Sequence, residues 1–133
     1  MILSLDHIAI AVPALTEAID RFAKDFGLEL AGTEEVSSAK TKTAFFPISG
    51  TQIELISPMD GQGPVARSLE RAGPGLHHLC FSTNNLTAEM ERLQALGYRF
   101  TSTTPQRGAH NTMVAFIHPK SSGGVLIELV QHP

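Results

Sequence analysis

The chain has 133 residues, of which 42% are hydrophobic and 17% charged, proportions typical of a folded globular protein. Its net charge of −3 gives no reason to expect nucleic acid or an anionic membrane as a partner. The single cysteine, Cys80, excludes an internal disulfide and suits a reducing compartment. Because the sequence also lacks a signal-peptide pattern and an apolar stretch of transmembrane length, we expect a cytoplasmic protein.

The first predicted element is a strand around His7. There His7, Ala9 and Ala11 alternate with Ile8 and Ile10, and this period of two is typical of a strand with two different faces. The isoleucines are expected to pack in the core. The small alanines are expected to leave room for a ligand beside His7.

A helix follows the first strand, and the other strands of the first half come after it. The helix is predicted by apolar residues at helical spacing and by a glycine at its end: Leu15, Ile19, Phe22, Phe26 and Gly27. Residues 36–58 are expected to hold the strands, with Gly50 near a hairpin turn. Glu54 lies between two apolar residues there, and a carboxylate in such a strand is costly unless it is paired or metal-bound.

A segment rich in proline and glycine separates the two halves. Pro64–Arg71 is predicted to form a short helix with Val65 and Leu69 on one face, whereas Gly61–Gly63 fits a simple loop equally well. We therefore predict one domain built from two modules and a connector, with the boundaries 1–58, 59–75 and 76–133.

The second half repeats the first. A shift of 71 residues superimposes the strand around His7 on the strand around His78, and a shift of 74 residues superimposes Glu54 on Glu128. The second helix and its end are predicted by Leu86, Met90, Leu93 and Gly97, with further strands within residues 99–131. Repetition on this scale indicates two copies of one βαβββ unit and an α+β fold.

The repeat pairs two histidines with two glutamates, 47 residues apart in the first half and 50 in the second. Any one of these residues alone is better explained as a structural histidine or an exposed glutamate, and a duplicated structural position is the alternative for all four. His77 competes with His78, but the repeat aligns His78 with His7. Equivalent placement favours one metal site with the ligands His7, Glu54, His78 and Glu128.

Two imidazoles and two carboxylates suit an octahedral divalent ion such as Co²⁺, Mn²⁺, Ni²⁺ or Mg²⁺, and Zn²⁺ is also possible. The open positions of such an ion suit a substrate that offers two oxygen atoms. The ion then acts as a Lewis acid that stabilises an enolate, and a nearby carboxylate removes the proton alpha to the carbonyl.

With these residues in place, the chain resembles the methylmalonyl-CoA epimerases of the vicinal oxygen chelate (glyoxalase/bleomycin-resistance) superfamily over essentially its whole length. The most specific stretch is Val114–Leu129, and Leu5–Val12, Ile53–Leu55 and Gly75–His78 also match. The resemblance implies a glyoxalase-like fold, in which two βαβββ modules form a cup-shaped, partly open mixed sheet around the metal. It also implies a homodimer.

The resemblance further implies metal-dependent epimerisation of an acyl-CoA substrate, methylmalonyl-CoA, through an enolate. The metal positions carry over to His7, His78 and Glu128, with Glu54 at a position that is Gln in some members, and Co²⁺ is the preferred ion. The resemblance assigns one acid/base role to Glu128. Thr43 stands where some members carry a second catalytic glutamate.

Residues near the substrate are expected in two loops. His110 is a candidate replacement acid/base, although an exposed loop histidine is the simpler interpretation. CoA carries phosphates, so basic residues are expected around the site. The candidates are Lys40, Lys42, Arg67, Arg107 and Lys120. Lys120 and Ser121, in the most specific stretch, are the preferred substrate-binding residues.

Two alternatives use the same superfamily fold. A glyoxalase I-type lactoylglutathione lyase would use the same ligands, but the 114–129 stretch favours the epimerase. A non-catalytic small-molecule-binding protein typically lacks the full ligand set, and a measurement of bound metal would identify it. An iron dioxygenase is disfavoured because such sites generally use two histidines and one carboxylate.

Overall fold

The computed structural model describes residues 1–133 and divides into two compact units. One unit comprises His7–His77, and the other comprises Met1–Asp6 together with His78–Pro133. Strand β1 (Ile2–Ala11) contributes residues to both units. No helix combines the length and the apolar character that crossing a membrane would require.

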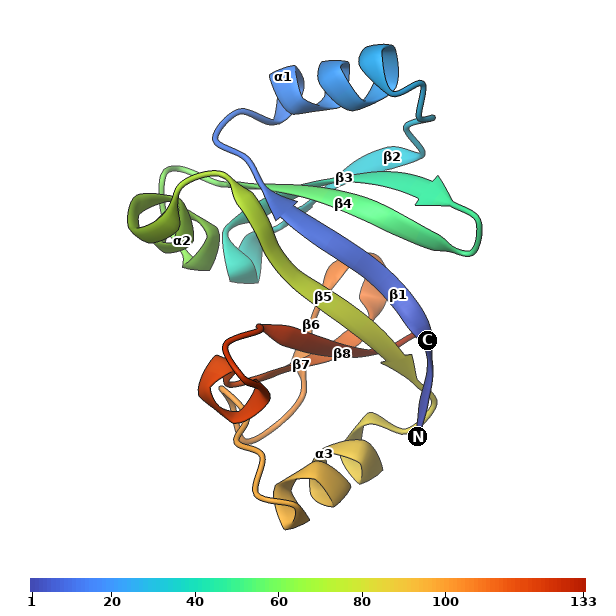
Figure 1. Cartoon of the computed structure of the whole chain (residues 1–133), viewed down its shortest axis with the longest axis vertical. Helices are drawn as coiled ribbons and strands as arrows, with labels where there is room; N and C mark the ends of the chain where they lie inside the picture. The colour runs from blue at the N-terminus through green and yellow to red at the C-terminus, as the bar shows by residue number, and fades with distance from the viewer. The chain divides into compact units, whose positions relative to one another are not determined.

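The chain order confirms a βαβββ pattern in both halves (Figure 1). The first half contains β1, α1 (Leu15–Asp20), β2 (Gly32–Val36), β3 (Thr41–Ile48) and β4 (Thr51–Pro58). The second half contains β5 (Gly75–Thr83), α3 (Leu86–Ala95), β6 (Gln106–Arg107), β7 (Met113–Ile117) and β8 (Ile127–Gln131). The predicted connector helix is α2 (Pro64–Ala72), and short 3-10 turns occupy Ser37–Ala39, Ala109–Asn111 and Pro119–Ser122.

Each unit contains both parallel and antiparallel strand pairs. In the first, the strand order is β2-β3-β4-β1, with β3 antiparallel to both neighbours and β1 parallel to β4. In the second, the order is β5-β8-β7-β6, with β5 parallel to β8 and β7 antiparallel to both neighbours. The predicted mixed sheet of an α+β fold is therefore confirmed.

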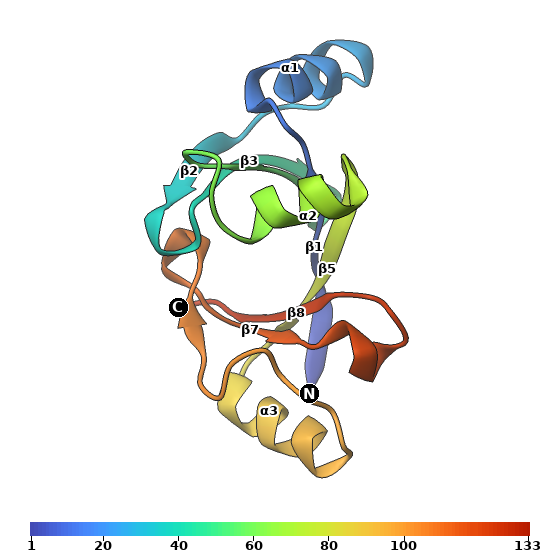
Figure 2. The same ribbon diagram turned by 90° about the vertical axis from the view of Figure 1, so that its left-hand side faces the viewer.

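Helices cover the strands through small apolar clusters. In the first unit, α1 packs on one face through Ala18 against Phe46 and Leu55, while α2 packs on the other face through Val65 (Figure 2). In the second unit, α3 packs through Leu86 and Met90. The first helix and the connector helix therefore lie on opposite faces of the same strands.

The helix that follows β1 departs from the predicted pattern at its end. After Asp20 the backbone continues as a π-helix over Arg21–Asp25. The wider turn changes which side chains face the core. Phe22 and Ala23 pack there, whereas Phe26 is 62% exposed and only meets Phe22 edge-on. Phe26, the last apolar residue of the predicted helical spacing, therefore contributes little to the core.

The strands of the first half begin earlier than predicted. The sequence indicates strands within residues 36–58, but β2 already begins at Gly32. This strand lies at the edge of the sheet and pairs only with β3. Its residues are exposed or half-buried, and the charged Glu34 and Glu35 hide the apolar alternation that would reveal it.

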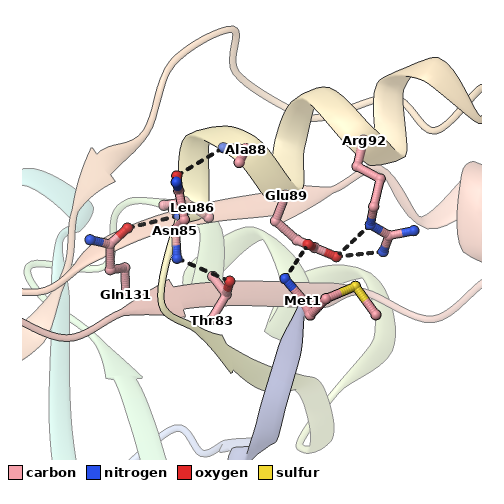
Figure 3. A network of polar contacts seen from close by, with 8 residues as sticks. All are labelled: Met1, Thr83, Asn85, Leu86, Ala88, Glu89, Arg92 and Gln131. Atoms are coloured by element: carbon pink, nitrogen blue, oxygen red, sulfur yellow. Dashed lines mark hydrogen bonds and ion pairs between the residues drawn. The ribbon is translucent and has the colours of Figure 1, made fainter.

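Polar contacts tie α3 to the strands of the second unit (Figure 3). The side chain of Asn85 caps the helix by accepting from Ala88 N at 3.1 Å, and Leu86 N donates to Gln131 Oε1 at 2.7 Å. Glu89, only 2% exposed, accepts from Arg92 and lies 2.8 Å from the Met1 amine. The hydrogen bond from Arg92, helped by that amine, lowers the pKa of Glu89 to about 2 although burial opposes the shift.

Candidate functional site

The first half contains a buried histidine–glutamate pair on adjacent parallel strands. Ala9 of β1 stands opposite Glu54 of β4, and His7 lies two residues before Ala9 on the same face. His7 Nδ1 lies 3.0 Å from Glu54 Oε2, and both residues are buried. The parallel register thus brings together the two ligand candidates of this half.

The second half repeats this arrangement with the same register. Cys80 of β5 stands opposite Glu128 of β8, and His78 lies two residues before Cys80. His78 Nε2 lies 2.9 Å from Glu128 Oε1, and only 8% and 10% of the two side chains are exposed. A histidine and a glutamate therefore contact each other within each half, with the same offset along the strands.

The chemistry of these pairs fits a divalent cation. A carboxylate between apolar strand residues needs a compensating charge or hydrogen bond, and here the compensation comes from an imidazole nitrogen at contact distance. An imidazole nitrogen and a carboxylate oxygen are ligands that divalent metal ions accept, so each pair could supply one nitrogen and one oxygen to such an ion.

An aromatic ring accompanies each glutamate. Phe45 of β3 stands opposite Glu54, and Phe116 of β7 stands opposite Glu128. The ring of Phe116 meets the ring of His78 edge-on, with 5.3 Å between the centroids. The shift of 71 residues that aligns the histidines also aligns the two phenylalanines, so the repeat carried the signal for these supporting residues.

A difference between the halves lies two residues before each glutamate. Gln52 Nε2 donates to Glu54 Oε2 at 2.9 Å, on the oxygen that also contacts His7. The equivalent position before Glu128 is Leu126, whose side chain has no donor. Sequence reasoning missed Gln52, although the 74-residue alignment places it opposite a residue of different chemistry.

The alanines beside His7 do not leave open space. Ala9 and Ala11 are fully buried and form a cluster with Ile56 and with Val65 of α2. The sequence predicts room for a ligand along this face, but α2 occupies its far end. The expected open space beside Ala9 and Ala11 is therefore filled by the side chains of this cluster.

Thr43 and His110, the positions at which the chain departs from the resemblance, lie in different environments. Thr43 is buried and stands opposite Ile56, so it shares the face of Glu54. His110 is exposed in the turn Ala109–Asn111, with a left-handed φ of 54°. The structure therefore places the hydroxyl of Thr43, but not a carboxylate, on the face that carries the first pair.

The loop between β7 and β8 carries Lys120 and Ser121. Ser121 Oγ accepts a hydrogen bond from Arg99 N at 3.0 Å, and Lys120 N donates to His118 Nδ1 at 3.2 Å. The loop leads directly to β8, where Leu79 N, next to His78, donates to Leu126 O at 3.3 Å. The loop therefore borders the end of the second pair, with the Lys120 side chain exposed and the Ser121 hydroxyl engaged.

A family model, a curated sequence and a solved structure all match this chain over most of its length. The sequence model of the Glyoxalase/Bleomycin resistance protein/Dioxygenase superfamily matches residues 6–116. An ethylmalonyl-CoA/methylmalonyl-CoA epimerase of Cereibacter sphaeroides is 37% identical and covers 98% of this chain and 99% of its own. The crystal structure of methylmalonyl-CoA epimerase from Mycobacterium tuberculosis is 36% identical, with a TM-score of 0.94 over 99% of this chain and 89% of its own.

A further solved relative is a substituted Streptomyces coelicolor methylmalonyl-CoA epimerase in complex with 2-nitronate-propionyl-CoA. It is 28% identical, and its TM-score of 0.95 covers 99% of this chain and 96% of its own. Similarity of this extent shows that the two chains share the same fold over nearly their whole length.

Proposed function

We propose, because the chain belongs to the glyoxalase/bleomycin resistance protein/dioxygenase superfamily, that it is an isomerase that interconverts the (2R) and (2S) epimers of methylmalonyl-CoA. The observation that carries this proposal is the duplicated buried pair, His7 with Glu54 and His78 with Glu128. The glyoxalase-type alternative uses the same ligands, and the named relatives favour the epimerase over it.

The four residues of the two pairs are proposed to hold one divalent metal ion, with Co²⁺ preferred. The proposal rests on the identical register of the two pairs and on the ligand set they offer. When bound, such an ion supplies Lewis-acid stabilisation of the negative charge that develops on the thioester oxygen after loss of the alpha proton.

Glu128 is proposed to move the proton at the alpha carbon. The proposal rests on the resemblance to the epimerases, which assigns one acid/base role to this glutamate, and on the burial of its side chain. Gln52, which donates to Glu54 at 2.9 Å, has no counterpart before Glu128, where Leu126 stands. Glu54 is proposed to bind the metal alone, together with His7 and His78.

Epimerisation requires proton transfer on both faces of the planar enolate, so a second group must act opposite Glu128. Thr43 shares a face with Glu54, but its hydroxyl is not a base at neutral pH. Thr43 is therefore proposed to orient the substrate rather than to exchange its proton. His110 is kept as a candidate for the second transfer because it is the titratable residue of the turn before β7.

Lys120 and Ser121 are proposed to contact the substrate from the loop that borders His78 and Glu128. Because the Ser121 hydroxyl accepts from Arg99 N, it holds the loop to the chain before β7 rather than pointing freely outward. The exposed ammonium group of Lys120 is available to an anionic part of the substrate.

A homodimer is also proposed. Three large hydrophobic residues at the start of β1 are exposed to solvent. The exposed fractions are 43% for Ile2, 62% for Leu3 and 36% for Leu5. A second copy would remove these residues from water. Sedimentation equilibrium measures the assembly state, and a monomer at micromolar concentration would contradict the proposal. A cytoplasmic location stays a prediction, consistent with a single cysteine, Cys80, that forms no disulfide.

The experiment that tests the function follows solvent deuterium into the alpha position of methylmalonyl-CoA by NMR. The purified protein loaded with Co²⁺ is expected to exchange this proton and to lose the activity on chelation. Ethylmalonyl-CoA, one methylene larger, tests the acyl pocket, where roughly 1–3 kcal/mol of discrimination is expected. If the loaded protein incorporates no deuterium while it isomerises a thiol–ketoaldehyde adduct, the epimerase assignment is replaced by the glyoxalase one.

A further inference from the structure

We infer that Arg99 and His118 form a phosphate-binding pair on the metal-ligand face of the second unit, which holds the phosphates of the CoA moiety. The identity of the ligand, CoA, rests on the proposed function. The position of the two residues follows from the strand register around β7. Neither residue belongs to the four proposed metal ligands or to the acid/base groups.

The strand register places His118 on the face of Glu128. Phe116 stands directly opposite Glu128, so the two share a face, and His118 follows Phe116 by two residues. Ile117, between them, points the other way and is 4% exposed. His118 therefore lies on the face that also carries the His78 ring in contact with Phe116.

Arg99 joins this face by pairing with His118. Phe100 forms an antiparallel bridge with Ile117, and His118 N donates to Arg99 O at 2.7 Å. Residues opposite each other in an antiparallel pair share a face, so Arg99 lies beside His118 while Phe100 packs against the α3 cluster. Two basic side chains thus stand side by side, and both are exposed.

Both side chains of the pair can donate hydrogen bonds. His118 Nδ1 accepts from Lys120 N at 3.2 Å, which leaves Nε2 as the donor of the neutral ring. The guanidinium of Arg99 adds a fork of donors that matches phosphate oxygens. The surrounding segments 97–102 and 117–126 contain no acidic residue that would neutralise the pair.

The distance from the proposed reaction centre suits CoA. Moving from Glu128 one strand across to Phe116, two residues along to His118 and one strand across to Arg99 spans on the order of 10 Å. The thioester and the phosphates of CoA stand at opposite ends of its flexible pantetheine arm. An extended arm is longer than this separation, but its flexibility lets it bend so that the pair holds the nucleotide end while the thioester lies at the paired glutamate.

The test is a calorimetric titration of the whole protein with CoA and with pantetheine, which lacks phosphate, so its outcome does not depend on epimerase activity. Arg99→Met is expected to weaken CoA binding roughly tenfold relative to pantetheine. Arg99→Lys should recover part of the loss. Lys24→Met, which removes an exposed cation from the other unit, serves as the matched control and should leave the ratio unchanged.

A kinetic comparison separates the phosphates from the other anionic group of the substrate, its free carboxylate. The substrates are methylmalonyl-CoA and methylmalonyl-pantetheine. In Arg99→Met and in His118→Asn, kcat/KM should fall more for methylmalonyl-CoA than for methylmalonyl-pantetheine. An equal loss on both substrates would assign the pair to the carboxylate and overturn the inference, as would an unchanged CoA-to-pantetheine binding ratio. If the wild-type protein exchanges no deuterium but still binds CoA in a way that depends on Arg99, only the proposed function is overturned.

Discussion

The two His–Glu pairs share their strand register but differ in their contacts. In each half, the histidine lies two residues before the residue that stands opposite the glutamate. The first contact joins His7 Nδ1 to Glu54 at 3.0 Å, and the second joins His78 Nε2 to Glu128 at 2.9 Å. Gln52 donates to the first glutamate, whereas Leu126 stands at the equivalent position before the second. The strands therefore repeat the pairs, while the ring nitrogen in contact and the neighbouring side chain differ.

This difference indicates how a duplicated unit can support an asymmetric reaction. A carboxylate held by an extra amide donor keeps its orientation and suits a ligand. Leu126 supplies no such donor two residues before Glu128. We propose that Glu54 only binds the metal whereas Glu128 also transfers the proton, and substitutions at these positions can confirm or contradict this proposal.

The largest effect is expected from Glu128→Gln. The amide keeps an oxygen ligand but cannot accept the alpha proton, so deuterium exchange into methylmalonyl-CoA should fall by roughly a thousandfold. Metal content, measured by elemental analysis, separates lost chemistry from a lost ion. A variant that retains the ion and exchanges at the wild-type rate would show that Glu128 is not the base.

Glu54→Gln is expected to act more weakly and in a different way. Because glutamine keeps the oxygen, the ion should bind with reduced affinity as the charge is lost. At saturating metal, exchange should stay within roughly tenfold of the wild type. A metal titration followed by exchange assays measures both quantities. Equal losses for Glu54→Gln and Glu128→Gln at saturating metal would mean that the two glutamates play the same part.

The helices of the two halves also differ, which predicts a local effect on stability. No side chain caps the start of α1, whereas α3 has the Asn85 cap and the buried carboxylate of Glu89 (Figure 3). Glu89→Gln removes charge-assisted contacts with Arg92 and the Met1 amine and should lower the free energy of unfolding by about 1–3 kcal/mol. Urea denaturation at neutral pH measures the change, with the exposed Glu91→Gln as control.

The same contact predicts a pH dependence. The pKa of Glu89 is about 2 in the folded protein, compared with the ordinary value of 4.5 that applies to the unfolded chain. As the pH falls, the unfolded chain therefore binds this proton before the folded protein does. The stabilisation is therefore fully present above about pH 4.5 and is lost as the pH falls toward 2. The gap between wild type and Glu89→Gln should narrow over this range, and a constant gap would contradict the ion-pair explanation.

Much of this architecture is predictable from the sequence because it depends on local periodicity and on the repeat. The alternation around His7 and the equivalence of His78 and Glu128 indicated the strands and both pairs. Contacts made by the folded chain were not accessible in this way. The edge strand with Glu34 and Glu35 has no apolar alternation, the π-turn exposes Phe26, and Val65 reaches Ala9 only when α2 folds back. Gln52 could not be predicted because its role depends on a side-chain contact with Glu54 and not on a periodic sequence pattern.

The smallest expected effect comes from exchanging the residues that distinguish the pairs. Gln52→Leu removes the donor from Glu54 and should weaken metal binding by roughly 2- to 10-fold, the value of one hydrogen bond, with little change in exchange at saturating metal. Leu126→Gln places an amide two residues before Glu128 and should instead slow exchange several-fold while metal binding is kept. The pair of variants is measured by metal titration and NMR exchange together. If both variants affect the same quantity to the same extent, the donor at this position does not set the roles of the two glutamates, and their asymmetry must come from elsewhere in the two halves.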